Sequence, residues 1–276
     1  MGEKRVTRRG IPEALQVRPG SRLKLRDASA ARDFGWDQER ADTATRENLI
    51  RLEELQHKMN ADGRFSMLVV LQAIDGGGKD STLRRVFSAF SPQSCTVTSF
   101  KAPSQLELRH DYLWRIHQHA PPRGEIAVFN RSHYEDVLVV RVNNLVPPAV
   151  WGERYSQIND FEKLLTACGT RVVKLFLHIS KDEQKRRFQE RITDRRKHWK
   201  FDPADLNKRK QWDAYRAAYE AMLERCSTSL APWYVVPADR KGFRDFAVSQ
   251  ILLRELEAMP LRWPEPSYDP TKIRVT

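Results

Sequence analysis

The stretch LQAIDGGGKDS, residues 71–81, combines glycines, one lysine and two acids in an order typical of a phosphate-binding loop. Such loops read GxxxxGK followed by Ser or Thr, and they lie between a strand and a helix. The sequence departs from this pattern twice, because Ala73 replaces the first glycine and Asp80 replaces the hydroxyl residue. A further acid, Asp75, stands inside the loop. We therefore predict a phosphate-binding loop whose ligand is compatible with nearby carboxylates.

Each residue type in this loop can fill a definite chemical role. Glycines let backbone amides approach an anion closely, and the lysine adds a positive charge beside the terminal phosphates. A carboxylate near phosphate is repelled unless a cation lies between them, which predicts that Asp75 holds Mg²⁺. The predicted phosphate-binding residues of the loop are Gly76, Gly77, Gly78, Lys79, Asp80 and Ser81. The alternative is a strand-to-helix turn that needs glycines only for its shape.

A second group of candidate residues follows the apolar run 126–130, in the sequence FNRSHYED. The end of such a strand is the usual place of a Walker B acid, but this sequence has Asn130 there. Arg131 can donate two N–H groups to phosphate oxygens and offset charge during phosphoryl transfer. We expect Glu135 or Asp136 to compensate for the missing acid. Alternatively, Arg131 only caps the end of the strand.

Residues 181–200 form a third group, with nine Lys or Arg residues against four Asp or Glu residues. In P-loop kinases a basic lid closes over the phosphates and excludes water. Arg187, Arg191 and Arg195 are four apart, so they share one helix face if the helix continues that far. We predict that these three arginines bind phosphate. The alternative is a basic helix that is simply exposed to solvent.

The elements that must position these residues alternate along the chain. Five short apolar runs predict strands at 65–74, 95–100, 126–130, 172–179 and 234–237. Helical periodicity predicts helices at 43–60, 79–90, 106–119, 151–168, 181–193, 205–226 and 241–258. Strands alternating with helices indicate an α/β fold, in which a parallel sheet is covered by helices on both faces. Continuous apolar runs such as MLVVL agree with strands buried on both sides.

The composition limits the partners and the domain organisation. The chain has 276 residues and a formal net charge of +12, which indicates an anionic partner: a phosphate compound, nucleic acid or anionic lipid. The three cysteines are far apart and no apolar run approaches a membrane span, so we expect a cytoplasmic protein. We predict a partly ordered basic arm over residues 1–40, a single domain over 41–265 with a lid at about 181–210, and a tail over 266–276.

Residues 10 to 265 resemble the polyphosphate kinase 2 family. The resemblance rests on LQAIDGGGKDSTLRRVF, SFKAPSQLELRHDYLWR, FNRSHYEDVLVVRV, HISKDEQKRRFQERITDRRKHWKF and APWYVVPADRKGFRDFAVSQIL. The amino-acid sequences of the third and fourth motifs are most similar to those of the branch that phosphorylates both nucleoside mono- and diphosphates. The resemblance implies a P-loop kinase-like three-layer α/β/α sandwich with a helical lid, inorganic polyphosphate as donor, Mg²⁺ as cofactor, and homo-oligomers.

The resemblance also implies roles for individual residues. Asp75 and Lys79 match the acid and lysine of the family's loop, Arg131 matches its second-motif arginine, and the basic run 185–197 matches its lid. We take Asp75, Lys79 and Arg131 as the catalytic residues. The predicted nucleotide-binding residues are Phe100, Lys101, Pro103, Asn130, Glu135 and Arg141. Many members have Asp where this chain has Asn130, so the metal contact of that position stays open.

Two other classes of protein fit parts of the pattern. The loop and lid would equally serve a small-molecule kinase that uses ATP as donor. The excess of basic residues would suit a nucleic-acid-binding protein with a degenerate loop, but the sequence has no zinc finger, RNP-like strand or helix-turn-helix signal. We therefore expect no nucleic-acid partner.

Overall fold

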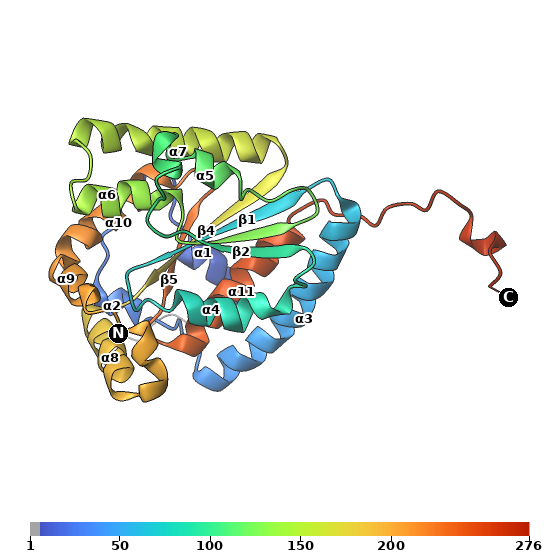
Figure 1. The fold of residues 1–276 in the computed structure, drawn as a ribbon. Coiled ribbons are helices and arrows are strands. Elements are labelled where there is room, and N and C mark those ends of the chain that lie inside the picture. The colour runs from blue at the N-terminus through green and yellow to red at the C-terminus, as the bar shows by residue number, and fades with distance from the viewer. Residues whose placement is uncertain (1–5, 276) are drawn as a thin grey trace.

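The computed structural model describes residues 6–275, in which helices cover both faces of one five-stranded parallel sheet (Figure 1). The strands are β1 (Ser66–Ala73), β2 (Cys95–Ser99), β3 (Ile126–Asn130), β4 (Thr170–His178) and β5 (Trp233–Pro237). Their order across the sheet is β2-β3-β1-β4-β5, and every neighbouring pair is parallel. The predicted α/β fold with its five parallel strands is confirmed.

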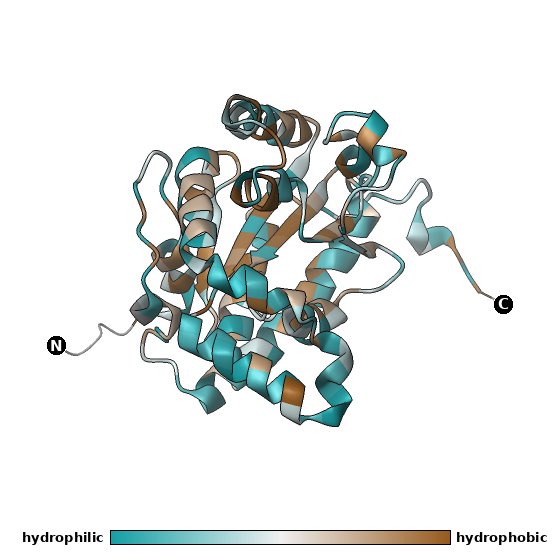
Figure 2. Ribbon diagram, turned by 60° about the vertical axis from the view of Figure 1, so that its left-hand side comes forward, coloured by the Kyte–Doolittle hydropathy of each residue, from teal (hydrophilic) through white to brown (hydrophobic). Residues whose placement is uncertain are grey.

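Side chains of the strands belong to two separate hydrophobic clusters, one on each face of the sheet. Met67, Val69 and Leu71 of β1 belong to one cluster, and Leu68 and Val70 belong to the other. Figure 2 shows hydrophobic residues along the strands and hydrophilic residues on the outer faces of the helices. Because β1 is buried on both sides, it reads as a continuous apolar run, which made it predictable.

Two sets of helices form the outer layers. On the first face lie α1 (Ile11–Leu15), α3 (Gln38–Asp62), α4 (Lys79–Val86) and α11 (Lys241–Glu257). On the second face lie α5 (Trp114–His117), α6 (Val139–Val142), α7 (Pro148–Ala167) and α10 (Trp212–Cys226). The remaining short elements are α2 (Asp27–Ala30), η1 (Arg8–Gly10), η2 (Phe87–Ala89), η3 (Glu107–Arg109), η4 (His133–Val137) and η6 (Pro270–Lys272). Within residues 6–275, no helix is both long and apolar enough to cross a bilayer.

The segment predicted as a lid forms three short helices at one end of the sheet: α8 (Lys181–Thr193), η5 (Arg195–Lys200) and α9 (Ala204–Lys210). The Ser180 side chain caps α8 by accepting from the Glu183 amide at 3.1 Å. α8 ends at Thr193, because Asp194 is extended and its side chain caps η5 instead. Arg195 therefore does not continue the helix face that carries Arg187 and Arg191.

The prediction of one helix over residues 106–119 is wrong. The structure has only η3 and α5 there, separated by residues 110–113. The Asp111 carboxylate accepts from the amides of Leu113 and Trp114, at 2.9 and 3.1 Å. Such local side-chain bonds compete with the helix ladder, and they interrupt an otherwise helical pattern.

The N-terminal segment packs on the domain over residues 6–37, in place of the partly ordered arm that we expected. Ile11, Leu15 and Val17 are buried, and the Val17 amide donates to the Trp233 carbonyl oxygen at 2.8 Å. Ile11 and Leu15 belong to the short helix α1, but Val17, Leu25 and Phe34 lie in segments without helix or strand, so the segment shows no sustained helical or strand period. Residues 1–5 of the predicted arm, and residue 276 of the predicted tail, lie outside the described residues. Residues 262–275 are exposed and run away from the domain (Figure 1).

Candidate active site

The glycine-rich loop connects the end of β1 to the start of α4. Gly76 and Gly78 have φ values of 84° and 99°, in the left-handed region that favours glycine. A Cβ atom on Gly78 would also collide with the guanidinium of Arg244. The loop therefore needs glycine for both conformation and space, and it places the N-terminus of α4 where backbone amides can hold an anion.

Lys79 is the first residue of α4 and is buried. Its Nζ atom lies 3.1 Å from the Ala73 carbonyl oxygen, at the end of β1. Burial, followed by the positive charge of Arg131, lowers the pKa of Lys79 to about 8. The ammonium is held in the loop at neutral pH with few competing partners, as a phosphate-binding lysine requires.

Asp75 and Arg131 meet because β1 and β3 are adjacent strands. The Arg131 amide donates to the Leu71 carbonyl oxygen at 3.2 Å, and Arg131 has a φ of 63°. Its guanidinium donates to Asp75 Oδ1 at 2.5 Å and to Glu135 Oε2 at 3.2 Å. Lys208 of α9 donates to the other Asp75 oxygen at 2.8 Å. These four side chains form an alternating array of charges at the carboxyl ends of the strands.

Neighbouring charges set the ionisation of this array. Burial alone would raise the pKa of Asp75, but Arg131, Lys79 and Lys208 outweigh it and lower the pKa to about 2. Burial alone would lower the pKa of Arg131, but the negative charges of Glu135 and Asp75 outweigh burial and raise this pKa. Asp75 and Arg131 are therefore both charged throughout the physiological range.

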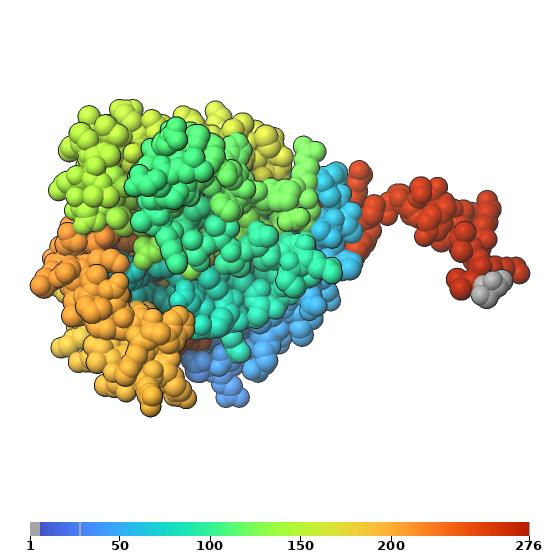
Figure 3. All heavy atoms as spheres, in the orientation of Figure 1, coloured from blue at the N-terminus to red at the C-terminus, as the bar shows by residue number. Residues whose placement is uncertain are grey.

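Two cavities open on either side of Asp75 and Arg131, and both residues line both of them. We call the first, of about 380 Å³, the basic cavity; it contains the glycine-rich loop and seven further cations, Arg84, Arg187, Arg191, Lys197, Lys200, Lys241 and Arg244. We call the second, of about 710 Å³, the large cavity; apolar and aromatic residues line much of it, including Phe100, Leu108, Tyr112, Leu138, Val139 and Tyr215. Figure 3 shows the surface hollowed between the orange lid and the green and teal segments.

The predicted phosphate-binding residues fall into two groups. All of the loop residues from Gly76 to Ser81 line the basic cavity, as do Arg187 and Arg191. Arg187 is buried, and its guanidinium donates to the Gly76 carbonyl oxygen at 2.9 Å, so it also holds the loop. Arg195 is exposed on η5 and lines neither cavity.

The predicted nucleotide-binding residues are likewise divided. Phe100, Lys101, Pro103 and Glu135 line the large cavity, although Phe100 also packs edge-on against Phe129 in the core. Asn130 lines the basic cavity, and its Nδ2 atom lies 3.3 Å from Asp80 Oδ1 and 3.2 Å from Ser99 Oγ. Arg141 lies outside both cavities, where it donates to the Tyr155 hydroxyl at 2.9 Å.

The sequence did not single out Arg244, which lines the basic cavity from α11. Its side chain is 1% exposed, and its Nε and Nη2 atoms donate to Asp245 at 2.9 and 2.7 Å. The third nitrogen, Nη1, is buried and has no hydrogen-bond partner among the described residues. A buried donor without a partner is costly, and because this one lines the basic cavity, a ligand atom there could accept from it. The signals in the sequence are the pair Lys241 and Arg244 at the start of α11 and the motif APWYVVPADRKGFRDFAVSQIL, which contains both residues.

The residues around Asp75 fit a Mg²⁺ ion that takes most of its ligands from substrate phosphates and water. Among the described residues, no group of three or more His, Cys, Asp or Glu side chains is arranged to hold a metal ion. Magnesium in phosphate-transfer sites commonly uses only one or two protein carboxylates, with substrate phosphates and water. Asp75 is ionised, 15% exposed, and faces both cavities, so it is one carboxylate of the required kind, and Mg²⁺ would share or displace its contacts with Arg131 and Lys208.

The fold and the site define a class of protein. A buried strand, a glycine-rich turn, a buried lysine and a helix follow one another, and a basic lid lies beside the turn. These features define the P-loop kinase class of α/β proteins.

Comparison with known proteins narrows the class to one family. Residues 35–263 match the family model described as polyphosphate kinase 2. An AMP/ADP-polyphosphate phosphotransferase of Meiothermus ruber is 52% identical over 223 residues, which are 81% of this chain and 84% of the relative. An ADP-polyphosphate phosphotransferase of Rhodopseudomonas palustris is 45% identical over 232 residues, 80% of each chain.

A solved structure agrees with these relatives. The crystal structure of polyphosphate kinase 2 from Arthrobacter aurescens TC1 superposes with a TM-score of 0.91 at 41% identity, covering 96% of both chains. The chain belongs to the polyphosphate kinase 2 family, so the resemblance found in its sequence motifs is confirmed.

Proposed function

We propose that this protein transfers a phosphoryl group from inorganic polyphosphate to AMP and ADP. The observation that carries the proposal is the pair of cavities that meet at Asp75 and Arg131. The basic cavity suits a donor that is a chain of negative charges. The large cavity, with its apolar walls, suits a nucleoside. The similarity to an AMP/ADP-polyphosphate phosphotransferase of Meiothermus ruber supports the same choice of donor and acceptors.

The residues of the loop hold the donor in this mechanism. Lys79 and the loop amides bind the terminal phosphates. Arg244 Nη1, which lies beside Gly78 and has no partner among the described residues, supplies one more donor. Lid residues such as Arg191 and Lys200 close the outer side of the basic cavity. This enclosure excludes water, which would otherwise compete with the acceptor for the phosphoryl group.

Arg131 stands at the boundary between the two cavities, where the phosphoryl group must cross. Its guanidinium can offset the charge that the equatorial oxygens carry in a loose transition state. The acceptor is a nucleotide phosphate, which is already an anionic nucleophile, so no strong general base is needed. Mg²⁺, which Asp75 would hold, supplies charge neutralisation between donor and acceptor phosphates when it is bound. Association into homo-oligomers, which the resemblance implied, stays a prediction.

A direct assay tests the proposal. Purified protein is incubated with Mg²⁺, long-chain polyphosphate and either AMP or ADP, and the formation of ADP and ATP is followed. We expect product with both acceptors and none when polyphosphate is left out. If folded protein forms no product with AMP and none with ADP, the proposed reaction is excluded. Product formed from ATP and a metabolite, without polyphosphate, would favour a different kinase.

The variant Asp75→Asn tests the metal proposal within this assay. Asparagine keeps the size of the side chain but has no charge. The variant therefore loses the carboxylate that would bind Mg²⁺ and the ion pair with Arg131. We expect turnover to fall by at least about a hundredfold, with little change in the thermal unfolding temperature. Titration of Mg²⁺ against each protein separates the two effects, because the wild type alone should show saturable metal dependence. Near-normal turnover in the variant would contradict the role of Asp75.

A further inference from the structure

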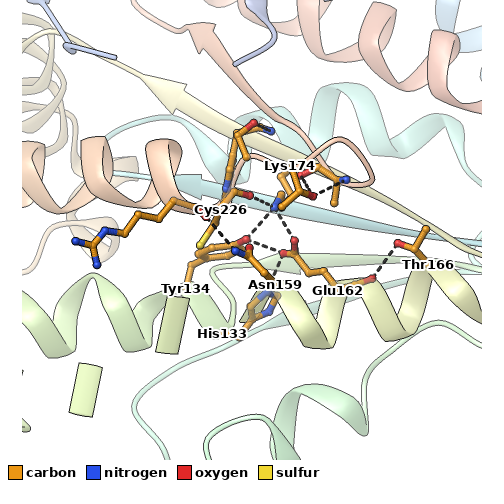
Figure 4. Close-up of polar contacts among 12 residues, drawn as sticks. His133, Tyr134, Asn159, Glu162, Thr166, Lys174 and Cys226 are labelled. Carbon is orange, nitrogen blue, oxygen red and sulfur yellow. Dashed lines mark hydrogen bonds and ion pairs between the residues drawn. The ribbon is translucent and has the colours of Figure 1, made fainter. Parts of the chain in front are cut away.

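A buried polar cluster lies beside the turn that carries Arg131, and it is separate from both cavities. We define this buried cluster as His133 and Tyr134 of η4, Glu162 of α7, and Lys174 of β4. None of the four side chains is more than 2% exposed. Figure 4 shows that their side chains point toward one another, although they come from separate elements of the chain.

The contacts within the buried cluster are short and centred on one ion pair. Lys174 Nζ donates to Glu162 Oε2 at 2.6 Å, to the Tyr134 hydroxyl at 2.9 Å, and to the Cys226 carbonyl oxygen at 2.5 Å. The Tyr134 hydroxyl donates to Glu162 Oε1 at 2.7 Å, and His133 Nε2 lies 3.3 Å from the same oxygen. Two consecutive residues of η4 are therefore tied to α7 and β4.

Burial and neighbouring charges set the charge states of Glu162, His133 and Tyr134. Burial alone would raise the pKa of Glu162, but Lys174 and His133 outweigh it and the pKa is lowered. Burial lowers the pKa of His133 and raises the pKa of Tyr134 well above its usual value. The cluster thus contains one carboxylate, one neutral imidazole and one protonated phenol beside the lysine.

Stability is a poor explanation for such a cluster. A buried ion pair costs so much desolvation that well-packed apolar residues of the same size are often equally stable or more stable. A buried pair does, however, fix the direction of every group that it contacts. The groups fixed here belong to a turn with functional residues at both ends, Arg131 and Glu135.

The turn is short, so fixing its middle fixes its ends. Arg131 begins it in the left-handed region, with a φ of 63°. The Tyr134 amide donates to Ser132 Oγ at 3.2 Å, and the Glu135 amide donates to the Ser132 carbonyl oxygen at 3.0 Å. Glu135 then returns to contact the Arg131 guanidinium at 3.2 Å. A shift of Tyr134 would move Glu135, and with it the guanidinium.

We propose that Glu162 and Lys174 are positioning residues for phosphoryl transfer: together with His133 and Tyr134 they fix the turn 131–135, so that Arg131 stays between the two cavities. This inference rests on the proposed function, because it assigns Arg131 to the transferred group. The buried cluster touches neither substrate and acts only through Arg131 and Glu135.

The variant Tyr134→Phe tests the inference with the smallest change. It keeps the aromatic ring and removes the hydroxyl that joins the turn to Lys174 and Glu162. We expect kcat to fall about tenfold while both KM values stay within about twofold, since Arg131 acts mainly on the transition state. Hydrogen–deuterium exchange of the peptide covering residues 130–137 should become faster. Unchanged exchange and unchanged kcat would overturn the inference.

A double-mutant cycle separates positioning from a general loss of structure. Tyr134→Phe is combined with Arg131→Lys, which keeps a charge but not the guanidinium. If the hydroxyl acts through Arg131, its removal should cost less than about twofold in the Arg131→Lys background. The same tenfold loss in both backgrounds would overturn the inference.

A second variant removes the ion pair without leaving one charge buried alone. Glu162→Gln combined with Lys174→Met should fold, and it should also lower kcat about tenfold. Asn159→Ala is the matched control on the same helix, because Asn159 donates to the Arg225 carbonyl oxygen at 3.0 Å and is not part of the hydrogen bonds that join the buried cluster to the turn. Its kcat should stay within about twofold of the wild type, whatever its stability.

Failure of the proposed function and failure of this inference give different results. A wild-type protein that forms no product with polyphosphate and either acceptor refutes the function. In that case the exchange measurement still decides whether the buried cluster fixes residues 130–137. Normal wild-type turnover with an unaffected Tyr134→Phe variant refutes only the inference.

Discussion

In the proposed mechanism Lys79 carries the charge that binds the terminal phosphates, and its protonation has a testable pH dependence. Burial and the charge of Arg131 lower its pKa to about 8, so the free enzyme loses this charge as the pH rises through that value. Because kcat/KM reports the free enzyme, kcat/KM for polyphosphate is expected to fall on the alkaline side of about pH 8. A profile from about pH 6.5 to 9.5, at constant ionic strength, measures the effect.

The variant Lys79→Arg is the control for this profile. A guanidinium stays charged over the whole range, so the remaining activity of the variant should not fall near pH 8. An alkaline fall of the same shape in the variant would assign the titration to another group.

Gly78 and Gly152 form a matched pair of glycines with opposite expectations. Gly78 has a φ of 99°, and a Cβ there would collide with Arg244, so Gly78→Ala should displace the loop and lower turnover by at least about a hundredfold. Gly152 lies within α7, and a Cβ there would meet no atom within 4 Å. Gly152→Ala should leave turnover unchanged and stabilise the protein by about 0.5–1 kcal/mol.

Turnover and urea unfolding of both glycine variants provide the measurement. Full activity in Gly78→Ala would contradict the steric argument. A loss of stability in Gly152→Ala would contradict the assignment of that position as an unstrained helix interior.

At the residue scale, most of the predicted site residues that line the two cavities have a local signal in the sequence. The loop 75–81 could be recognised because its residues are consecutive and each has a role at a fixed offset. Lys208 reaches Asp75 across 133 residues of chain, and Arg244 reaches Gly78 from the last helix, so only the fold brings them together. Arg141 shows the converse, since it lies near Arg131 in sequence but contacts Tyr155 outside both cavities.

At the scale of elements, burial decides what could be predicted. Central strands such as β1 and β4 were found because both of their faces are covered and they contain long apolar runs. The edge strand β2, with the sequence CTVTS, is largely exposed and was found by its β-branched residues. Residues 106–119 have helical periodicity, but the capping bonds of Asp111 break it into short pieces. The same effect ended α8 before Arg195, where Asp194 begins a new helix.

The break between α8 and η5 leads to a prediction about the lid. Arg191 lines the basic cavity, whereas Arg195 is exposed and lies outside it. Arg191→Ala should raise KM for polyphosphate about tenfold by removing a contact to the donor, with a smaller effect on KM for AMP. Arg195→Ala removes the same charge and should change each KM by less than about twofold.

Initial rates at varied polyphosphate and at varied AMP measure these constants. Equal effects of the two variants would show that the net charge of the lid matters more than the position of Arg191. An effect of Arg191→Ala on KM for AMP alone would contradict its place in the basic cavity.

At the scale of the whole molecule, the N-terminal segment shows a limit of pattern reading. Ile11 and Leu15 of the short helix α1 and Phe34 complete the hydrophobic cluster on one face of the sheet, yet most of residues 6–37 belong to no helix or strand. Packing of an irregular segment depends on a surface formed by distant residues, which no local pattern records. The net charge is the opposite case, because it is a property of the whole chain that the sequence states directly.

The net charge of +12 predicts a difference in salt dependence between the two substrates. Polyphosphate is a chain of charges, and the basic cavity, which we propose as its site, contains cations from the loop, the lid and α11. Added salt screens such attraction, because the Debye length is only about 8 Å at physiological ionic strength. KM for polyphosphate should therefore rise several-fold between about 50 and 300 mM KCl.

KM for AMP provides the internal comparison in the same experiment. AMP carries few charges, and the large cavity offers its nucleoside mainly apolar and aromatic walls, whose contacts salt does not screen. Its KM should change by less than about twofold over the same range, with free Mg²⁺ held constant because polyphosphate binds the metal. Arg191→Ala should flatten the salt dependence for polyphosphate and leave that for AMP unaltered. If both KM values rise equally with salt, the two substrates do not divide between a basic and an apolar cavity, and the assignment of donor and acceptor sides fails.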